Sequence, residues 1–518
     1  MKRLGVKILL LVLFLNIIGK VYGQIFSPPY DQRYEDYMYW ELLKDSVLHT
    51  SFKPFILTRE DWMLFPTFSR YIHGKFWKRL FVKDNFLLES EDLSIHLNLL
   101  GQLSKGMYDT SSIDYFRNTR GFEIYGHLGK RVYYYTKFLE NQCVFRPYID
   151  SVINRFMVIP GEGWWKPFGK YGRDFTYAMG FLNYQPTHWL EIQLGHNKNF
   201  IGSGYRSLLL SDNSFVYPQL KLIFTWKNWR MYTMWTEFYS FHTRYYFYHY
   251  SKHGTFDFLS YAQKHFEIGL FEGTIWKTSD YRTYVNHFPV WFFVPWSGAV
   301  VYGLDGENNS VVGLDFNVHY KTYMLYGQFV ADKLDLSKSL MSSDNRYAYQ
   351  LGLRSYDVFM GKVPWMSMSF LAEFNLVRPY TYSSVYKYQS YSHYNQSLAE
   401  PLGADFKEFV FISQLRIFNL SLRFKHTWAL TDQMSDDDNV GRDIFLSPVM
   451  WKHRIGQVAP EQIIHNQVVA RLVLNAKTML GIYAMFDRRE VKFVSGHKIG
   501  NYMELGISTV IANRYYDF

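Results

Sequence analysis

A two-residue alternation of apolar and polar side chains recurs along this chain and constrains its fold more than any other feature. It is clearest in residues 93–99, where four aliphatic residues alternate with Ser94, His96 and Asn98. Similar stretches cover residues 190–194 and 420–425. Successive side chains of a strand point to opposite faces, so this period predicts strands with one apolar face and one polar face.

Aromatic residues are abundant, with 44 Tyr, 44 Phe and 15 Trp among 518 residues, yet the mean hydropathy is only −0.20. Outer-membrane strands are apolar on one face and carry aromatic residues at both membrane interfaces, so their average hydropathy stays modest. A large soluble all-β protein can reach the same average and is the alternative. Because a membrane strand takes about 9 to 11 residues, we predict an all-β fold, a transmembrane antiparallel β-barrel of about 18 strands in the outer membrane.

The longest uncharged apolar stretch of the predicted barrel runs from Phe288 to Leu304. Pro289 and Pro295 interrupt it, and a proline inside a helix removes a hydrogen bond and clashes with the preceding turn. We therefore predict strand ends joined by a loop here, which either packs inside the barrel or touches lipid.

The N-terminus predicts export. Cationic residues precede an apolar run from Ile8 to Ile18, and Val21-Tyr22-Gly23 offers a cleavage site, so residues 1–23 read as a signal peptide. Helical spacing of apolar residues in Tyr30–Val47 predicts a short amphipathic helix. We accordingly divide the mature chain into an N-terminal periplasmic helical segment, residues 24–60, and a barrel with internal and surface loops, residues 61–518.

Charge and cysteine content exclude several classes of protein. Loss of the four cations in residues 1–23 lowers the formal charge from +10 to +6, and the remaining Lys and Arg are scattered, which argues against nucleic acid as a partner. An anionic glycan or a lipopolysaccharide phosphate fits better. A single cysteine, Cys143, excludes an intrachain disulfide and a cysteine-based metal cluster. We predict no cofactor and no metal site.

The chain ends in a further alternating segment, Gly500 to Phe518. A final strand that ends on an aromatic residue resembles the signal read by the barrel assembly machinery of the outer membrane. We therefore predict that this segment closes the barrel and that Phe518 is the last residue of the closing strand.

Residues 194–213 form the most distinctive segment, a strand that runs into a glycine-punctuated loop. Gly202-Ser203-Gly204 resembles a phosphate-binding loop but lacks the Lys-Ser/Thr of a P-loop, so we reject nucleotide binding. His196 and the serines of this segment show no nucleophile-elbow pattern, so we predict no catalytic residues and no enzyme. The alternative is an inward-folded loop in which Arg206 pairs with Asp212. The motif residues to which we give a structural role are Gly195, Gly202, Gly204, Ser207, Ser211 and, at the chain end, Phe518.

Four other features are candidate binding sites. Trp164 and Trp165 lie in a turn-rich loop and either stack on sugar rings or sit in the lumen or at the membrane interface. The aromatic run Phe238–Tyr250 reads as an interface girdle. The acidic stretch Asp432–Asp443 either chelates Ca²⁺ or forms a solvated loop, and it lacks the spacing of a known calcium loop. His249 and His253 lie four apart in a predicted strand, so we discount a metal site there.

Three blocks resemble the Wzi family of capsule-assembly outer-membrane proteins, especially the RemB-type relatives of gliding bacteria. The blocks are Gly195–Asn213, Arg378–Tyr380 with His393–Phe406, and Asn513–Phe518. This chain departs from the family pattern at Ser203, Ser397 and Glu400, which bears on residue roles rather than on the fold. The resemblance implies a barrel of about 18 strands with a small periplasmic helical element. It also implies a non-catalytic surface lectin for capsular polysaccharide, or, for the gliding relatives, a role in motility and adhesin export.

Three functions follow as expectations. The first is a barrel that binds or organises surface polysaccharide or lipopolysaccharide in contact with outer-membrane lipid. The second is a structural subunit that docks other outer-membrane proteins of a secretion or gliding complex, and the third is a diffusion porin. For the first function the candidate ligand-binding residues are Trp164, Trp165, His196, Asn199, Arg206 and Asp212.

Overall fold

The computed structural model describes most of the barrel and parts of the N-terminal region. The described residues are 25–32, 35, 49–58, 83–109, 111–241, 249–277, 289–304, 306–335, 337–339, 342, 345–363, 365–386, 388–434, 439–448, 454–475, 477–509 and 511–518. The predicted signal peptide and most of the predicted helix Tyr30–Val47 lie outside these residues, so both stay predictions.

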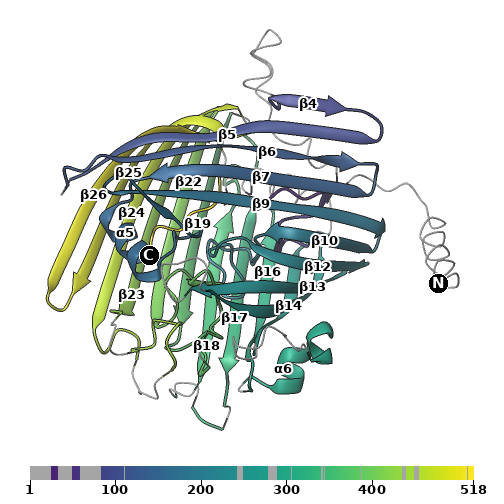
Figure 1. The fold of residues 1–518 in the computed structure, drawn as a ribbon, viewed down its shortest axis with the longest axis vertical. Helices are drawn as coiled ribbons and strands as arrows, with labels where there is room; N and C mark the ends of the chain where they lie inside the picture. The colour runs from purple at the N-terminus through teal and green to yellow at the C-terminus, as the bar shows by residue number, and fades with distance from the viewer. Residues whose placement is uncertain are drawn as a thin grey trace.

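Eighteen long antiparallel strands form a closed barrel, as predicted (Figure 1). They are β5 (Leu93–Tyr108), β6 (Tyr115–Leu128), β7 (Val132–Cys143), β9 (Gly172–Thr187), β10 (Leu190–Asn197), β12 (Tyr217–Trp226), β13 (Trp229–Phe241), β14 (His249–Gln263), β15 (Phe266–Trp276), β16 (Asn309–Tyr320), β17 (Tyr323–Lys333), β18 (Arg346–Ser355), β19 (Met366–Val377), β22 (Phe406–Ile417), β23 (Leu420–Asp432), β24 (Pro460–Asn475), β25 (Leu480–Phe493) and β26 (Gly496–Ser508).

Shorter elements lie between these strands or extend the wall. The short strands are β1 (Ile25–Phe26), β2 (Phe52–Lys53), β3 (Leu57–Thr58), β4 (Phe86–Glu89), β8 (Lys166–Phe168), β11 (Phe200–Ile201), β20 (Ser392–His393) and β21 (Gln396–Ser397). The helices are α5 (Pro147–Phe156), the 3₁₀ helix η2 (Val290–Phe293) and α6 (Ser297–Tyr302). Among the described residues no helix is long and apolar enough to cross a membrane.

The predicted alternation sorts side chains between lumen and lipid. On β5, Asn98 is 1% exposed and points inward, whereas its neighbour Leu99 is 66% exposed on the outer face. The same alternation leaves Leu194, Leu270 and Leu505 exposed outside the wall. A closed wall pairs every strand edge and an apolar outer face suits lipid, so this is an outer-membrane barrel, which confirms the predicted location.

Connections differ in length between the two ends of the barrel. At one end they are short turns, such as residues 129–131, 188–189 and 418–419. At the other end they include long loops, among them residues 198–216 and 378–405. Outer-membrane barrels place short turns in the periplasm and long loops outside the cell, so the long-loop end is the extracellular mouth.

The barrel closes between β26 and β5, but not as the sequence predicted. β26 pairs with β5 only over Tyr502–Ser508, and β4 pairs with β5 further along. The strand ends at Ser508, and Thr509 donates its backbone N–H to Gly101 O at 2.9 Å. Residues 511–518, named here the tail, then turn into the lumen, where Tyr515 and Asp517 are buried. The prediction that the closing strand ends on Phe518 is therefore wrong.

Candidate functional site

Three segments fill the lumen and are named here the plug: residues 49–58, 198–216 and 378–405. The first two pair through β2 and β11, and Gly202 donates its N–H to Ser51 O at 2.7 Å. The Phe52 ring stacks on the inward-facing Tyr232 ring of β13 at 4.0 Å. Residues 49–58 of the predicted N-terminal periplasmic segment thus lie inside the barrel.

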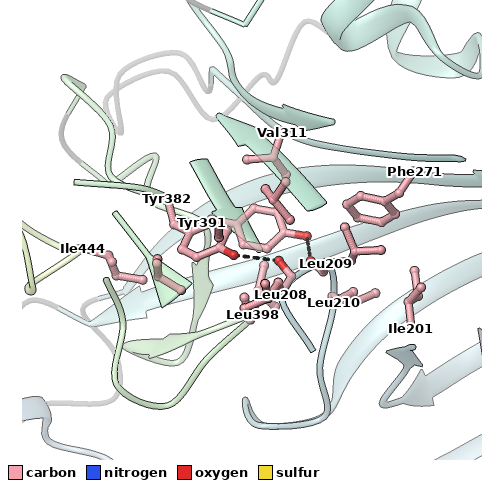
Figure 2. Close-up of a cluster of buried hydrophobic side chains, with 14 of the residues drawn as sticks. Ile201, Leu208, Leu209, Leu210, Phe271, Val311, Tyr382, Tyr391, Leu398 and Ile444 are labelled. Carbon is pink, nitrogen blue, oxygen red and sulfur yellow. Dashed lines mark hydrogen bonds between the residues drawn. The ribbon is translucent and has the colours of Figure 1, made fainter. Parts of the chain in front are cut away.

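The centre of the plug is the run Leu208-Leu209-Leu210, whose side chains are fully buried. The run lies outside the strands. Among the described residues, only Leu210 O of its three carbonyls accepts from a strand residue, the Ile201 N–H at 2.8 Å, so Leu208 O and Leu209 O need other donors. Figure 2 shows how the third plug segment supplies them: Tyr382 donates to Leu208 O at 2.7 Å and Tyr391 donates to Leu209 O at 2.6 Å. The predicted inward-folded loop is confirmed.

Arg206 anchors the plug to the wall, although not through the predicted pair with Asp212. Its guanidinium donates to both carboxylate oxygens of Glu408 on β22, at 2.7 and 3.2 Å, and lies 3.2 Å from Asp517 of the tail and 3.5 Å from Glu400. The residue is 2% exposed. Burial and the neighbouring Glu408 raise the pKa of the Glu400 carboxyl well above its usual range, against the effect of Arg206.

Asp212 instead fastens the plug to the tail. Its carboxylate accepts hydrogen bonds from Tyr515 Oη at 2.7 Å and from Asn513 Nδ2 at 2.8 Å. The tail is bound again at Asp517, which accepts from Lys425 Nζ at 2.9 Å. Burial would raise the pKa of the Asp517 carboxyl, but Arg206 and Lys425 hold it well below its usual range. Plug and tail therefore form one charged, buried unit.

Above this unit, at the long-loop end, lies a cavity of about 670 Å³, named here the mouth cavity, a size within the range of about 300 to 1,000 Å³ typical of ligand pockets. All three blocks that carry the family resemblance contribute to its lining. Asn213 ends the first block, Gln396 and Leu402 belong to the second, and Phe518 ends the third. Helix α5, the loop after β23 and residues of β24 and β25 also line it. The blocks are far apart in sequence and converge at this one place.

The mouth cavity combines charged, amide and aromatic groups. Arg155 lies 3.5 Å from Asp443, and Arg442 lies 2.6 Å from Glu461. The rings of Phe156 and Phe445, both lining residues, are 5.4 Å apart. Carboxylates and guanidinium groups can bond sugar hydroxyls, and aromatic faces can cover the apolar face of a sugar ring.

Two lining residues carry buried donors without a partner in the described part of the chain: Gln396 Nε2 and Arg442 Nε. The other amide atom of Gln396, Oε1, accepts the Gly161 N–H at 2.6 Å, which fixes the orientation of the amide. Buried polar groups are seldom left unpaired, so these donors suit a ligand that brings its own acceptors.

The candidate residues predicted from the sequence are dispersed. Trp164 and Trp165 are half-buried beside the plug, with Arg173 lying 4.0 Å over the Trp165 ring, and neither lines the mouth cavity. His196 is exposed on the outer face of β10. Asn199 is buried and donates to Gln219 Oε1 at 2.6 Å.

The predicted motif residues lie where the backbone approaches other groups closely or bonds a serine side chain. Gly202 has a φ of 130°, and an added Cβ would lie 2.4 Å from Gln328 Nε2. A Cβ at Gly204 would lie 2.1 Å from Glu373 Oε2, and Gly195 has a φ of 145°. Ser207 donates to Ile201 O, and Ser211 donates to Ala399 O at 2.6 Å. These contacts fit the structural role predicted for the motif.

Sequence reasoning missed the charged residues of the mouth cavity, Arg155, Arg442 and Arg489. Each comes from a different element, and no local spacing connects them. Asp443 did lie in the acidic stretch weighed for calcium, of which residues 435–438 are outside the described residues. Its described ends bond protein groups, Asp443 with Arg155 and Asp432 with three backbone N–H groups of residues 457–459. Among the described residues no group of three or more metal-ligating side chains is present.

Comparison with known proteins supports the architecture. No family model and no curated protein sequence matches the chain. Among solved structures it resembles Wzi, an outer-membrane protein involved in group 1 capsule assembly in Escherichia coli and described as a carbohydrate-binding β-barrel. The match has a TM-score of 0.56 and 11% identity and covers 94% of this chain and 100% of Wzi. OprD of Pseudomonas aeruginosa matches with a TM-score of 0.42 and 12% identity, covering 80% and 94% of the two chains. The Wzi match shows that this chain has the fold of a Wzi-like barrel.

Proposed function

We propose that this protein is a non-enzymatic outer-membrane barrel that binds or organises surface polysaccharide at the mouth cavity. The observation that carries the proposal is the convergence of the three family-like blocks on one extracellular cavity with unpartnered buried donors. A chain of sugars brings hydroxyl acceptors for those donors and ring faces for Phe156 and Phe445. Lipopolysaccharide also offers sugar hydroxyls and ring faces and is the alternative ligand.

The filled lumen favours binding over diffusion. Plug and tail meet at the centre of the barrel through Arg206, Asp212, Asp517 and their partners. A diffusion porin needs a continuous aqueous path, and charged residues buried in paired contacts do not line one. We therefore rank the porin third, and planar-bilayer recordings of the purified barrel should show no steady channel conductance.

Binding assays with purified surface polysaccharide test the proposal. Arg155→Ala removes a charged donor and should weaken binding about tenfold or more, since a charged hydrogen bond contributes about 1.5–3 kcal/mol. Phe445→Ala removes a ring face and should weaken binding about two- to tenfold, since an aromatic contact contributes about 0.5–1.5 kcal/mol. Arg131→Ala, in a short turn at the opposite end, is the matched control and should leave binding unchanged. Equal binding by all variants would refute the mouth cavity as the site.

The same three blocks carry a second candidate, a structural subunit of a secretion or gliding machine of the RemB type. In that case the mouth cavity receives a protein segment. A stable complex after mild detergent extraction, lost in Phe445→Ala, would favour this candidate. A monodisperse barrel that binds polysaccharide would favour the first.

A further inference from the structure

The described residues 289–304 of the loop between β15 and β16 lie on the outside of the barrel wall and do not line the mouth cavity. These residues, named here the flap, fold into η2 and α6. The prediction of strand ends at Phe288–Leu304 is wrong, because short helical turns use both prolines at their boundaries: Pro289 precedes η2, and Pro295 lies between η2 and α6. Figure 1 shows α6 at the side of the barrel, near the long-loop ends of the strands.

Beneath the flap, four neighbouring strands point polar side chains outward. Inward positions on these strands are occupied by Met234, Phe256, Phe271 and Val311, so the alternate positions face away from the lumen. The outward polar side chains, all 3% exposed or less, are Thr233, Asp257, Glu272, Thr274 and Ser310. An outer-membrane wall normally presents apolar groups here, and a bare carboxylate in lipid is costly.

The flap satisfies these polar groups with its backbone. Trp296 donates its N–H to Asp257 Oδ2 at 2.9 Å, and Ala299 donates its N–H to Glu272 Oε1 at 2.9 Å. In the opposite direction, Trp235 Nε1 of the wall donates to Phe292 O at 2.8 Å. The fit is close, because a Cβ at Gly298 would lie 2.0 Å from Thr274 Oγ1.

The opposite side of the flap is apolar. Val300 is 80% exposed, Val290 is 71% exposed and Phe293 is 58% exposed, and residues 289–304 contain no charged side chain. Exposed apolar patches of this kind mark contact with a membrane or a partner. Here the patch continues the lipid-facing belt, since Ile268 and Leu270 are exposed on the same outward face of β15 just below Glu272.

We propose that the flap is embedded in the membrane, binding the acyl chains of the outer leaflet with Val290, Phe293 and Val300 while its backbone covers the outward carboxylates Asp257 and Glu272. The outer face of the barrel thus carries a polar patch, and the flap, which packs on the wall without joining its sheet, shields this patch from lipid. This inference is independent of the proposed polysaccharide function. A protein partner on the same patch is the competing occupant.

Collision accessibility of spin labels in vesicles tests the proposal. The full chain with Cys143→Ser would carry one nitroxide, introduced at Val300→Cys, and be reconstituted in phosphatidylethanolamine–phosphatidylglycerol vesicles. Leu270→Cys supplies the lipid-facing reference, and Val385→Cys supplies the aqueous reference, because Val385 is an exposed residue of the third plug segment at the long-loop end. We expect the label at residue 300 to collide with oxygen in preference to a water-soluble nickel chelate, as at residue 270 and opposite to residue 385.

Three outcomes would overturn the proposal. A label at residue 300 that matches residue 385 would overturn the proposal, as would nickel accessibility in vesicles that disappears only in native membranes, which would indicate a protein partner. Gly298→Val should undock the flap and increase the mobility of the residue 300 label without loss of barrel folding, judged by resistance to unfolding in detergent. Unchanged label mobility in the folded Gly298→Val variant would also overturn it.

Discussion

Replacing Arg206 by Met should loosen the plug and tail while leaving the barrel wall intact. The change removes two hydrogen bonds to Glu408 and the contact with Asp517, and leaves these buried carboxylates and Glu400 without their guanidinium partner. Breaking a buried ion pair costs about 3–5 kcal/mol, chiefly because the remaining charge stays uncompensated.

Hydrogen exchange measures this cost residue by residue. A loss of about 3–5 kcal/mol in the stability of the plug corresponds to exchange about 10² to 10⁴ times faster at the amides of residues 205–212 and 513–517. Amides of β15 to β18 should keep their protection, because their bonds lie within the wall.

Two controls separate charge from shape. Arg206→Lys keeps the cation but loses the two-pronged contact with Glu408, so it should fall between wild type and Arg206→Met. Glu408→Gln added to Arg206→Met removes one uncompensated charge and should restore part of the protection. Exchange less than tenfold faster in Arg206→Met would refute the claim that this network holds plug and tail together.

Two further predictions concern the plug and the tail. Gly202→Val forces a side chain against Gln328 and strains a φ of 130°, so proteolysis of the 198–216 segment should become faster in the folded barrel. Acid should release the tail, because Glu162 lies 3.1 Å from Arg117 of β6 and 3.1 Å from Arg514 of the tail. Burial would raise the pKa of the Glu162 carboxyl, but Arg117 and Arg514 lower it to about 2. The stabilisation from this carboxylate is therefore complete above its unfolded pKa and is lost as the pH falls from about 4.5 towards 2. The loss amounts to about 3 kcal/mol. Exchange at residues 511–518, corrected for its intrinsic pH dependence, should accelerate in that window, and a flat profile would contradict this.

The strands of the fold follow from the sequence because period-two patterning is local. The alternation at residues 93–99 places Asn98 inside and Leu99 outside, as the pattern predicts. The C-terminal end follows a different rule. Tyr515, Tyr516 and Asp517 continue a strand-like pattern, yet ion pairs of Asp517 with Arg206 and Lys425 draw the segment into the lumen. Those partners are about 310 and 92 positions away, so no window of the sequence contains them.

The candidate site shows the same division. The structural role predicted for the glycines and serines of residues 195–211 rests on local features, such as the positive φ of Gly195 and Gly202 and the bond from Ser207 to Ile201 O. The predicted pair of Arg206 with Asp212 rested on their closeness in sequence, whereas in the structure each binds a residue of the tail. The mouth cavity depends on packing of α5 and three long loops, which leaves no signature in any one of them.

Equilibrium binding of purified surface polysaccharide to the detergent-solubilised barrel, compared between wild type and Phe445→Ala, tests the central claim most directly. The account predicts saturable binding by wild type, weakened about two- to tenfold in Phe445→Ala, since an aromatic contact contributes about 0.5–1.5 kcal/mol. Saturable binding that is identical in Phe445→Ala and Arg155→Ala, or no binding by a folded wild-type barrel, would contradict it.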